Sequence, residues 1–71
     1  MHIGNRIREV MKEKKMSAIA IAKIINCERT NIYNIYARKD INTKLLEQFC
    51  IILNHDFFKE LSKDLNQRKG K

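Results

Sequence analysis

Apolar residues recur along most of this chain at intervals of three and four, which is the spacing of amphipathic helices. Such segments predict five helices, over residues 3–14, 18–25, 29–37, 44–53 and 57–65. The chain has no proline, and its only two glycines lie near the ends. A sheet normally needs more turn residues than this. The pattern therefore predicts an all-α fold.

Residues 17–37 predict two short helices joined by a tight turn. Ser17 is suited to accept the free backbone N–H groups that begin the first helix. Ala22 is small where two helices would cross closely, and Asn26 tolerates the left-handed backbone that ends many helices. The second helix leaves a polar and aromatic side outside. This arrangement is the outline of a DNA-reading helix-turn-helix. The outward residues are Arg29, Thr30, Tyr33, Asn34 and Ala37.

The predicted core is aliphatic. The two central helices are expected to turn a shared set of residues toward it: Ile21, Ala22, Ile24, Ile25, Ile32 and Ile35. Tyr36 follows Ile35 directly and is also assigned to the core. Residues 44–53 are too apolar for a surface helix, so we expect this helix to be the central support against which the first three pack.

The last predicted helix carries more apolar residues than one small core readily holds: Phe57, Phe58, Leu61 and Leu65. We expect part of this surface, at Phe57, Phe58 and Leu61, to join two copies in a homodimer. Asn54 is predicted to close the preceding helix, and Asp56 to cap this one. Residues 66–71 contain no apolar side chain. They predict a disordered basic tail after a helix-turn-helix domain of residues 1–65.

Length and charge narrow the function. A chain of 71 residues makes one small domain, too small for the cleft that most enzymes use. Residues 1–39 hold nine Lys and Arg against three Asp and Glu, a net charge of +6, whereas residues 40–71 hold six against five, a net +1. Basic side chains that neutralise phosphates release counterions. The asymmetry favours a polyanionic partner at the two-helix element, although basic charge also serves plain solubility.

Other classes of site find no support in the sequence. It has no Gly-rich phosphate loop, no Ser or Cys paired with a His, and no carboxylate cluster. Cys27 and Cys50 lie among apolar neighbours and are interpreted as small hydrophobes, and with His2 and His55 they lack the ligand spacing of a zinc site. We expect no enzyme activity, cofactor, metal or small-molecule ligand. Residues 1–16 mix charges throughout and no apolar run is long enough for a bilayer, so we expect a cytoplasmic protein without a membrane partner.

Five residues carry a family resemblance: Ala22, Asn26, Cys27, Ile32 and Ile35. With one amphipathic helix before them and two after, they resemble the Cro and lambda-repressor class of helix-turn-helix proteins, often called the XRE family. The resemblance covers residues 3–62, and the stretch INCERTNIYNIYAR, followed by a Leu-rich helix and NHDFF, is similar to small bacterial regulators of that group. It implies a five-helix lambda-repressor-like domain. It also implies a repressor that binds double-stranded DNA as a homodimer, with half-sites about 34 Å apart.

The resemblance also implies roles for individual residues. Base edges would be read by Arg29, Thr30, Tyr33 and Asn34, whose side chains suit guanine, adenine or thymine. The DNA backbone would be contacted by Ser17, Arg38, Lys39, Thr43 and Lys44. Glu28 departs from the family, which usually places Ser, Thr or Asp there as a cap.

Alternatives stay open at this stage. In one alternative, Arg29 pairs with a surface carboxylate. In another, Tyr33 belongs to the core. In a third alternative, the whole domain serves as a protein-interaction module, such as an antitoxin or an accessory subunit, that keeps the fold and binds another polypeptide.

Overall fold

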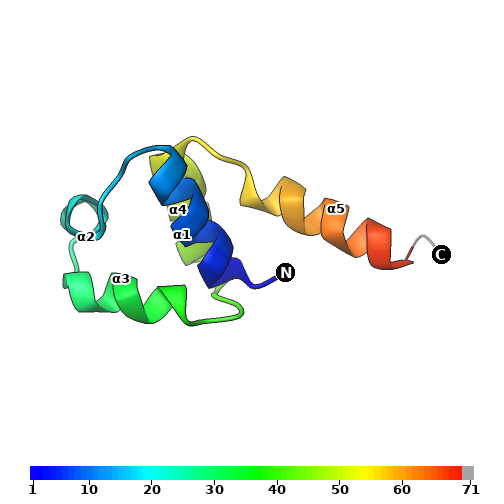
Figure 1. Cartoon of the computed structure of the whole chain (residues 1–71), viewed down its shortest axis with the longest axis horizontal. Helices are drawn as coiled ribbons and strands as arrows, with labels where there is room; N and C mark the ends of the chain where they lie inside the picture. Colours follow the sequence, from blue (N-terminus) through cyan, green and yellow to red (C-terminus); the bar gives the residue numbers. More distant parts are fainter. Residues whose placement is uncertain (70–71) are drawn as a thin grey trace.

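The computed structural model describes residues 1–69, in which five helices and no strand occur. They are α1 (Ile3–Glu13), α2 (Ala18–Ile25), α3 (Arg29–Tyr36), α4 (Thr43–Leu53) and α5 (Phe57–Lys69). Helices α1 to α4 gather at one end of the molecule, and α5 extends away from them (Figure 1). The elongated outline measures 42 × 20 × 20 Å. The predicted all-α, five-helix fold is confirmed.

Short polar side chains set most helix ends. Ser17, Asn42 and Asp56 cap α2, α4 and α5, each accepting a backbone N–H from three residues further on, at 3.1, 2.8 and 2.9 Å. Asn26 and Asn54 end α2 and α4 in the left-handed conformation, with φ of 67° and 50°. The predicted caps at Ser17 and Asp56 and the predicted helix ends at Asn26 and Asn54 are confirmed.

The end of α5 differs from the prediction. The helix does not stop at Leu65 but runs on to Lys69, so residues 66–69 form its last turn rather than a disordered tail. Neither Gly nor Pro interrupts these residues, and Arg68 donates to Asp64 at 2.9 Å across one helical turn. The remainder of the predicted tail, residues 70–71, lies outside the described part of the chain.

The core centres on α1. Its buried side chains include Ile7 and Val10, each 0% exposed, and α1 packs on both α3 and α4. The most extensive contact between helices is that of α2 with α3. In the described part of the chain, thirteen hydrophobic residues are buried: Ile3, Ile7, Val10, Met11, Ala18, Ile21, Ala22, Ile32, Ile35, Leu46, Phe49, Leu53 and Phe57.

Three core assignments need correction. Helix α4 is not the central support, because it buries only one side and leaves Ile51 75% exposed. Ile24 was expected inside but is 58% exposed, since it lies about 200° around the helix from buried Ala22. Tyr36 is only half-buried against the core, and its hydroxyl donates to the sulfur of Met11 at 3.5 Å.

The start of α1 rests directly on the end of α3. The N–H groups of Ile3 and Gly4 donate to the carbonyl oxygens of Lys39 and Arg38, each at 3.0 Å. A Cβ atom on Gly4 would lie 2.6 Å from the carbonyl oxygens of Arg38 and Tyr36. Only glycine permits this approach, which fixes the backbone that follows α3.

Among the described residues, α5 is attached by Phe57 and by two ion pairs to the N-terminal part of the chain, Arg6 with Glu60 and the Met1 ammonium with Asp64. Arg6 of α1 donates to both carboxylate oxygens of Glu60, at 2.9 and 2.8 Å, and holds the pKa of Glu60 below its usual value. Phe57 is 0% exposed and belongs to the core, and Leu61 packs partly against it. The prediction that Phe57 lies on a dimer surface is therefore wrong. Phe58 and Leu65, 39% and 50% exposed, are the apolar residues that α5 presents outward.

Candidate nucleic-acid interface

Helices α2 and α3 form the predicted two-helix element. The N–H of Cys27 donates to the carbonyl oxygen of Ala22 at 2.9 Å and closes the turn around left-handed Asn26. Ala22 is 4% exposed and leaves room for the close crossing of the two helices. Ile32 and Ile35 hold α3 on the core, at 0% and 7% exposure. The opposite side of α3 must therefore face outward.

All four predicted base-reading residues lie on that outward side. Arg29, Thr30, Tyr33 and Asn34 are exposed, and their positions in the helix place them side by side. In Figure 1, α3 runs along the lower edge of the molecule with no helix beyond it. Tyr33 is 50% exposed, so its alternative place in the core is wrong. None of the ion pairs between described residues includes Arg29.

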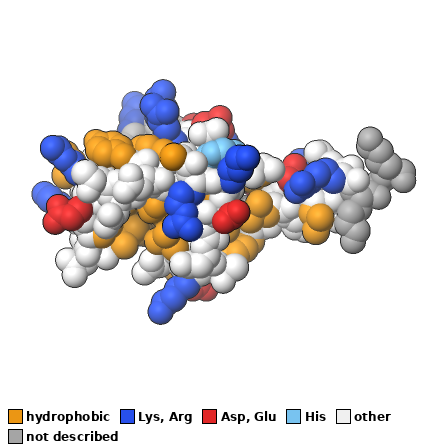
Figure 2. All heavy atoms as spheres, turned by 90° about the horizontal axis from the view of Figure 1, so that it is seen from below, with side chains coloured by type: hydrophobic (Ala, Val, Ile, Leu, Met, Phe, Trp, Pro, Cys, Tyr) orange, Lys and Arg blue, Asp and Glu red, His pale blue; other side chains and the backbone are white. Residues whose placement is uncertain are grey.

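The five predicted backbone-contacting residues are exposed as well: Ser17, Arg38, Lys39, Thr43 and Lys44. The oxygen of Ser17 accepts the capping N–H, which leaves its own hydrogen free to donate. Thr43 and Lys44 are the first two residues of α4. Figure 2 views the molecule from the α3 side and shows Lys and Arg side chains spread across this face.

Glu28 is the residue of this face that is least suited to the approach of an anion. It stands at the N-cap of α3, where the family usually has Ser, Thr or Asp, and its side chain makes no capping hydrogen bond. Its exposed carboxylate lies next to Arg29 in the chain, at the edge where an anion would approach. Phosphate contact at the start of α3 is therefore less favourable than at its end.

An aromatic cluster joins α3 to α1. The rings of Tyr33 and Tyr36 meet edge to face, with centroids 5.9 Å apart and planes at 65°. The guanidinium carbon of Arg8 lies 5.7 Å from the centroid of the Tyr36 ring. Burial raises the pKa of Tyr36, and neighbouring Tyr33 raises it further. Sequence reasoning missed Arg8, because nothing in the local pattern of α1 places it beside residue 36.

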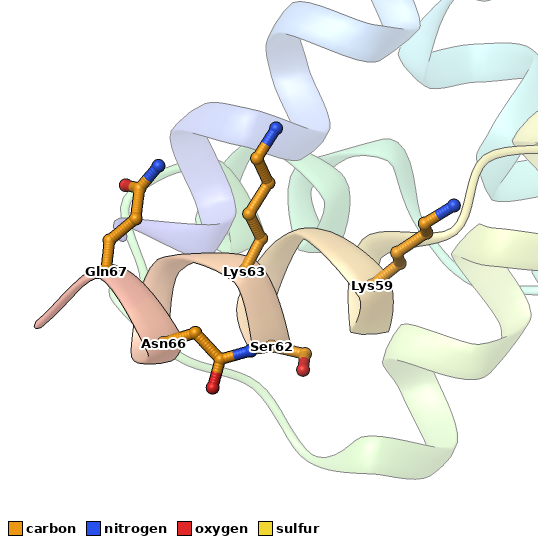
Figure 3. Close-up of a pocket in the computed structure, with 5 residues that line it drawn as sticks. All are labelled: Lys59, Ser62, Lys63, Asn66 and Gln67. Carbon is orange, nitrogen blue, oxygen red and sulfur yellow. The ribbon is translucent and has the colours of Figure 1, made fainter. Parts of the chain in front are cut away.

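The surface has no enclosed ligand site in its described part. A hollow of about 730 Å³ is formed by α5 alone, and its Lys59, Lys63 and Gln67 project to one side of the helix (Figure 3). Among the described residues, no three His, Cys, Asp or Glu side chains gather as metal ligands do. None of the five described helices has the length and apolar character needed to cross a membrane.

Comparison with known proteins agrees with this geometry. A family model described as Cro/C1-type HTH DNA-binding domain matches residues 6–64, which include all of α2, α3 and α4. Neither the curated proteins nor the solved structures include a significant match.

Proposed function

The chain belongs to the Cro/C1-type HTH DNA-binding domain family, and on that premise we propose that it is a sequence-specific regulator of transcription whose α3 reads the major groove of double-stranded DNA. One observation carries the proposal. The same short helix that Ile32 and Ile35 fix to the core exposes a continuous row of side chains, Arg29, Thr30, Tyr33 and Asn34, whose chemistry suits base edges. In its simplest form the regulator is a repressor, since occupying the operator is enough to exclude other proteins.

The chemistry of the row suits direct readout. Arg29 can donate two hydrogen bonds to a guanine, and Asn34 can bond both hydrogen-bonding groups of an adenine edge. Thr30 offers a hydroxyl and a methyl group, the latter to a thymine. The two bidentate contacts and the contact between methyl groups each distinguish one base pair from the others in the major groove.

The flanking residues orient the helix without reading sequence. Arg38 and Lys39 follow α3 on a backbone that α1 holds through two hydrogen bonds, and Lys44 is the second residue of α4. Cationic side chains on fixed backbone neutralise phosphates at defined positions, so they set the register of α3 on the duplex.

Substituting Asn34 tests the base-reading role. Asn34→Ala is expected to cost about 1–3 kcal/mol of affinity on a site selected from a random oligonucleotide pool, and much less on random DNA. Fluorescence anisotropy with labelled duplexes measures both. Since Asn34 is exposed, the midpoint of thermal unfolding of the Asn34→Ala variant should equal that of the unaltered protein.

Lys44→Ala is the matched control for this experiment. It should weaken all sequences alike and reduce the slope of log affinity against log salt by about one. Equal losses on selected and random DNA for Asn34→Ala would contradict base reading by α3.

A protein-interaction module is the second candidate, favoured by the exposed apolar residues Ile51, Phe58 and Leu65. A salt series separates the two functions. Binding dominated by phosphate contacts falls steeply with salt, whereas a protein interface does not. A chain that binds no duplex even at low salt would favour the second candidate.

We further propose that two copies pair through α5, so that their α3 helices reach half-sites about 34 Å apart. The contact would be formed by Phe58 and Leu65, in place of the Phe57 and Leu61 that the sequence suggested, together with Ile51 of α4, which lines a surface hollow with Phe58. Phe58 and Leu65 are seven residues apart and thus lie on one side of α5. An aromatic side chain of this kind is a common energetic centre of protein interfaces.

Phe58→Ala is expected to raise the dimer dissociation constant about tenfold or more, while the protomer stays folded. Sedimentation equilibrium over a range of concentrations measures this. Ile24→Ala, which removes an apolar residue of α2 that is even more exposed than Phe58, is the control and should leave the dimer unchanged. An unaltered dimer in the Phe58 variant would exclude α5 as the contact.

A further inference from the structure

We infer that Arg8 is a positioning residue for base recognition: together with Tyr36 it holds the ring of Tyr33 in one orientation, and Tyr33 so held discriminates between base pairs. This inference rests on the proposed function of α3. It assigns a task to a residue of α1 that stands outside the helix-turn-helix.

The geometry is a row of three neighbouring groups, Arg8, Tyr36 and Tyr33, that runs from α1 to the outer face of α3. Arg8 lies 5.7 Å from the Tyr36 centroid, within the range of a cation–π contact. Tyr36 lies 5.9 Å from Tyr33 in an edge-to-face arrangement, which is a favoured geometry for aromatic pairs. Tyr36 is half-buried, whereas Tyr33 is 50% exposed. The row therefore begins on an anchored ring and ends on an open one.

Tyr36 is a firm anchor for two reasons. Its hydroxyl donates to the sulfur of Met11, which is itself 2% exposed. Its ring packs against the hydrophobic core. No ion pair between described residues includes Arg8, so carboxylates do not draw its guanidinium away from the ring.

Holding the Tyr33 ring in one orientation changes how it binds a duplex. A tyrosine alone on a helix surface moves between staggered rotamers, and ordering it on binding costs conformational entropy. A ring that is already held in place loses less conformational entropy on binding. It also presents its apolar edge and its hydroxyl at fixed positions, where a thymine methyl and a neighbouring base pair are distinguished by shape.

A direct contact of Arg8 with a phosphate would have a different signature. It would persist after Tyr33 is removed, and it would contribute about one to the slope of log affinity against log salt. A positioning role depends on Tyr33 and leaves that slope unchanged. A double-mutant cycle separates the two.

The experiment compares Arg8→Ala, Tyr33→Ala and the double variant on a duplex selected by the unaltered protein. Arg8→Ala is expected to lose about three- to tenfold in affinity and to tolerate substitutions at the base pair that Tyr33 reads. In the Tyr33→Ala background, Arg8→Ala should cause no further loss. Arg8→Lys, which keeps the charge, should recover part of the discrimination. Lys12→Ala, another exposed cation of α1, should not alter base preference.

The free protein offers an independent readout. The chain contains two tyrosines and no tryptophan, so the Tyr36→Phe variant has Tyr33 as its only strong fluorophore and keeps a ring beneath Arg8. Adding Arg8→Ala to that variant is expected to increase the local motion of Tyr33 in a time-resolved anisotropy decay. Adding the selected duplex should change the Tyr33 emission.

Four results would overturn the inference. A loss from Arg8→Ala that remains in the Tyr33→Ala background, or a fall of about one in the salt slope, assigns Arg8 to a phosphate. An unchanged anisotropy decay shows that Arg8 does not hold the ring. If the unaltered protein binds no DNA, the proposed function fails, and this role with it. Normal binding with additive losses removes only the role of Arg8.

Discussion

Replacing Gly4 by alanine is expected to lower the free energy of unfolding by about 3 kcal/mol or more. Inside an ordinary helix the same change stabilises by roughly 0.5–1 kcal/mol. The sign reverses here because the added Cβ would lie 2.6 Å from the carbonyl oxygens of Arg38 and Tyr36, and closer still to that of Ile35. All three atoms belong to the backbone, so no side chain can swing aside. The start of α1 and the end of α3 must separate.

Thermal unfolding followed by circular dichroism measures the effect, with an expected fall in the midpoint of about 12 °C or more for a domain of this size. Asn5→Ala is the matched control. It changes the next residue of the same helix, whose side chain is exposed, and should stay within about 0.5 kcal/mol of the native protein. A Gly4→Ala protein as stable as this control would contradict the close approach.

The same substitution bears on DNA binding. Gly4 donates its N–H to Arg38, and Ile3 donates to Lys39, so α1 sets the path of the segment that carries two of the proposed phosphate contacts. At temperatures where the variant is still folded, its affinity for random DNA should fall as well, because a displaced backbone would move both cations away from the proposed phosphate contacts.

The helices themselves followed from local signals. Ser17, Asn26, Asn54 and Asp56 determine where α2, α4 and α5 begin or end, and each acts through atoms within a few residues of its own position. The resemblance to the Cro and lambda-repressor class, confirmed by the family match, rests on the same short-range features. The end of α5 was missed because a polar turn without Gly or Pro continues a helix as readily as it ends one.

The pattern of apolar and polar residues does not predict how the helices pack on one another. Periodicity shows which residues share a side of a helix, but where almost every residue is apolar, as in α2 and α4, it does not show which side meets the core. The burial of Ile24 and the central place of α4 were mispredicted for that reason. The exposure of Arg29 and Asn34 followed from the alternation within α3, whereas the contacts of Gly4 and Arg8 with the end of α3 depend on how α1 crosses it.

Phe57→Ala is expected to cost about 3–5 kcal/mol of stability, the usual loss when a buried phenylalanine is truncated. The side chain is 0% exposed and inserts the first turn of α5 into the core. The other described link between α5 and α1 with a close geometry is the part-exposed pair of Arg6 and Glu60, which contributes about 1 kcal/mol. Phe57 is therefore the main anchor of α5.

The neighbouring residue, Phe58, provides the control for this prediction. Phe58 is 39% exposed, and Phe58→Ala should change the free energy of unfolding by less than about 1 kcal/mol. If α5 joins two copies, the two variants must separate stability from association. Phe58→Ala weakens the dimer in a stable protomer, whereas Phe57→Ala weakens both, because an α5 without its anchor no longer presents Phe58 and Leu65 in a fixed place. Urea unfolding and sedimentation of both variants measure this, and a Phe57→Ala protein of native stability would contradict the anchoring of α5 on which the proposed dimer depends.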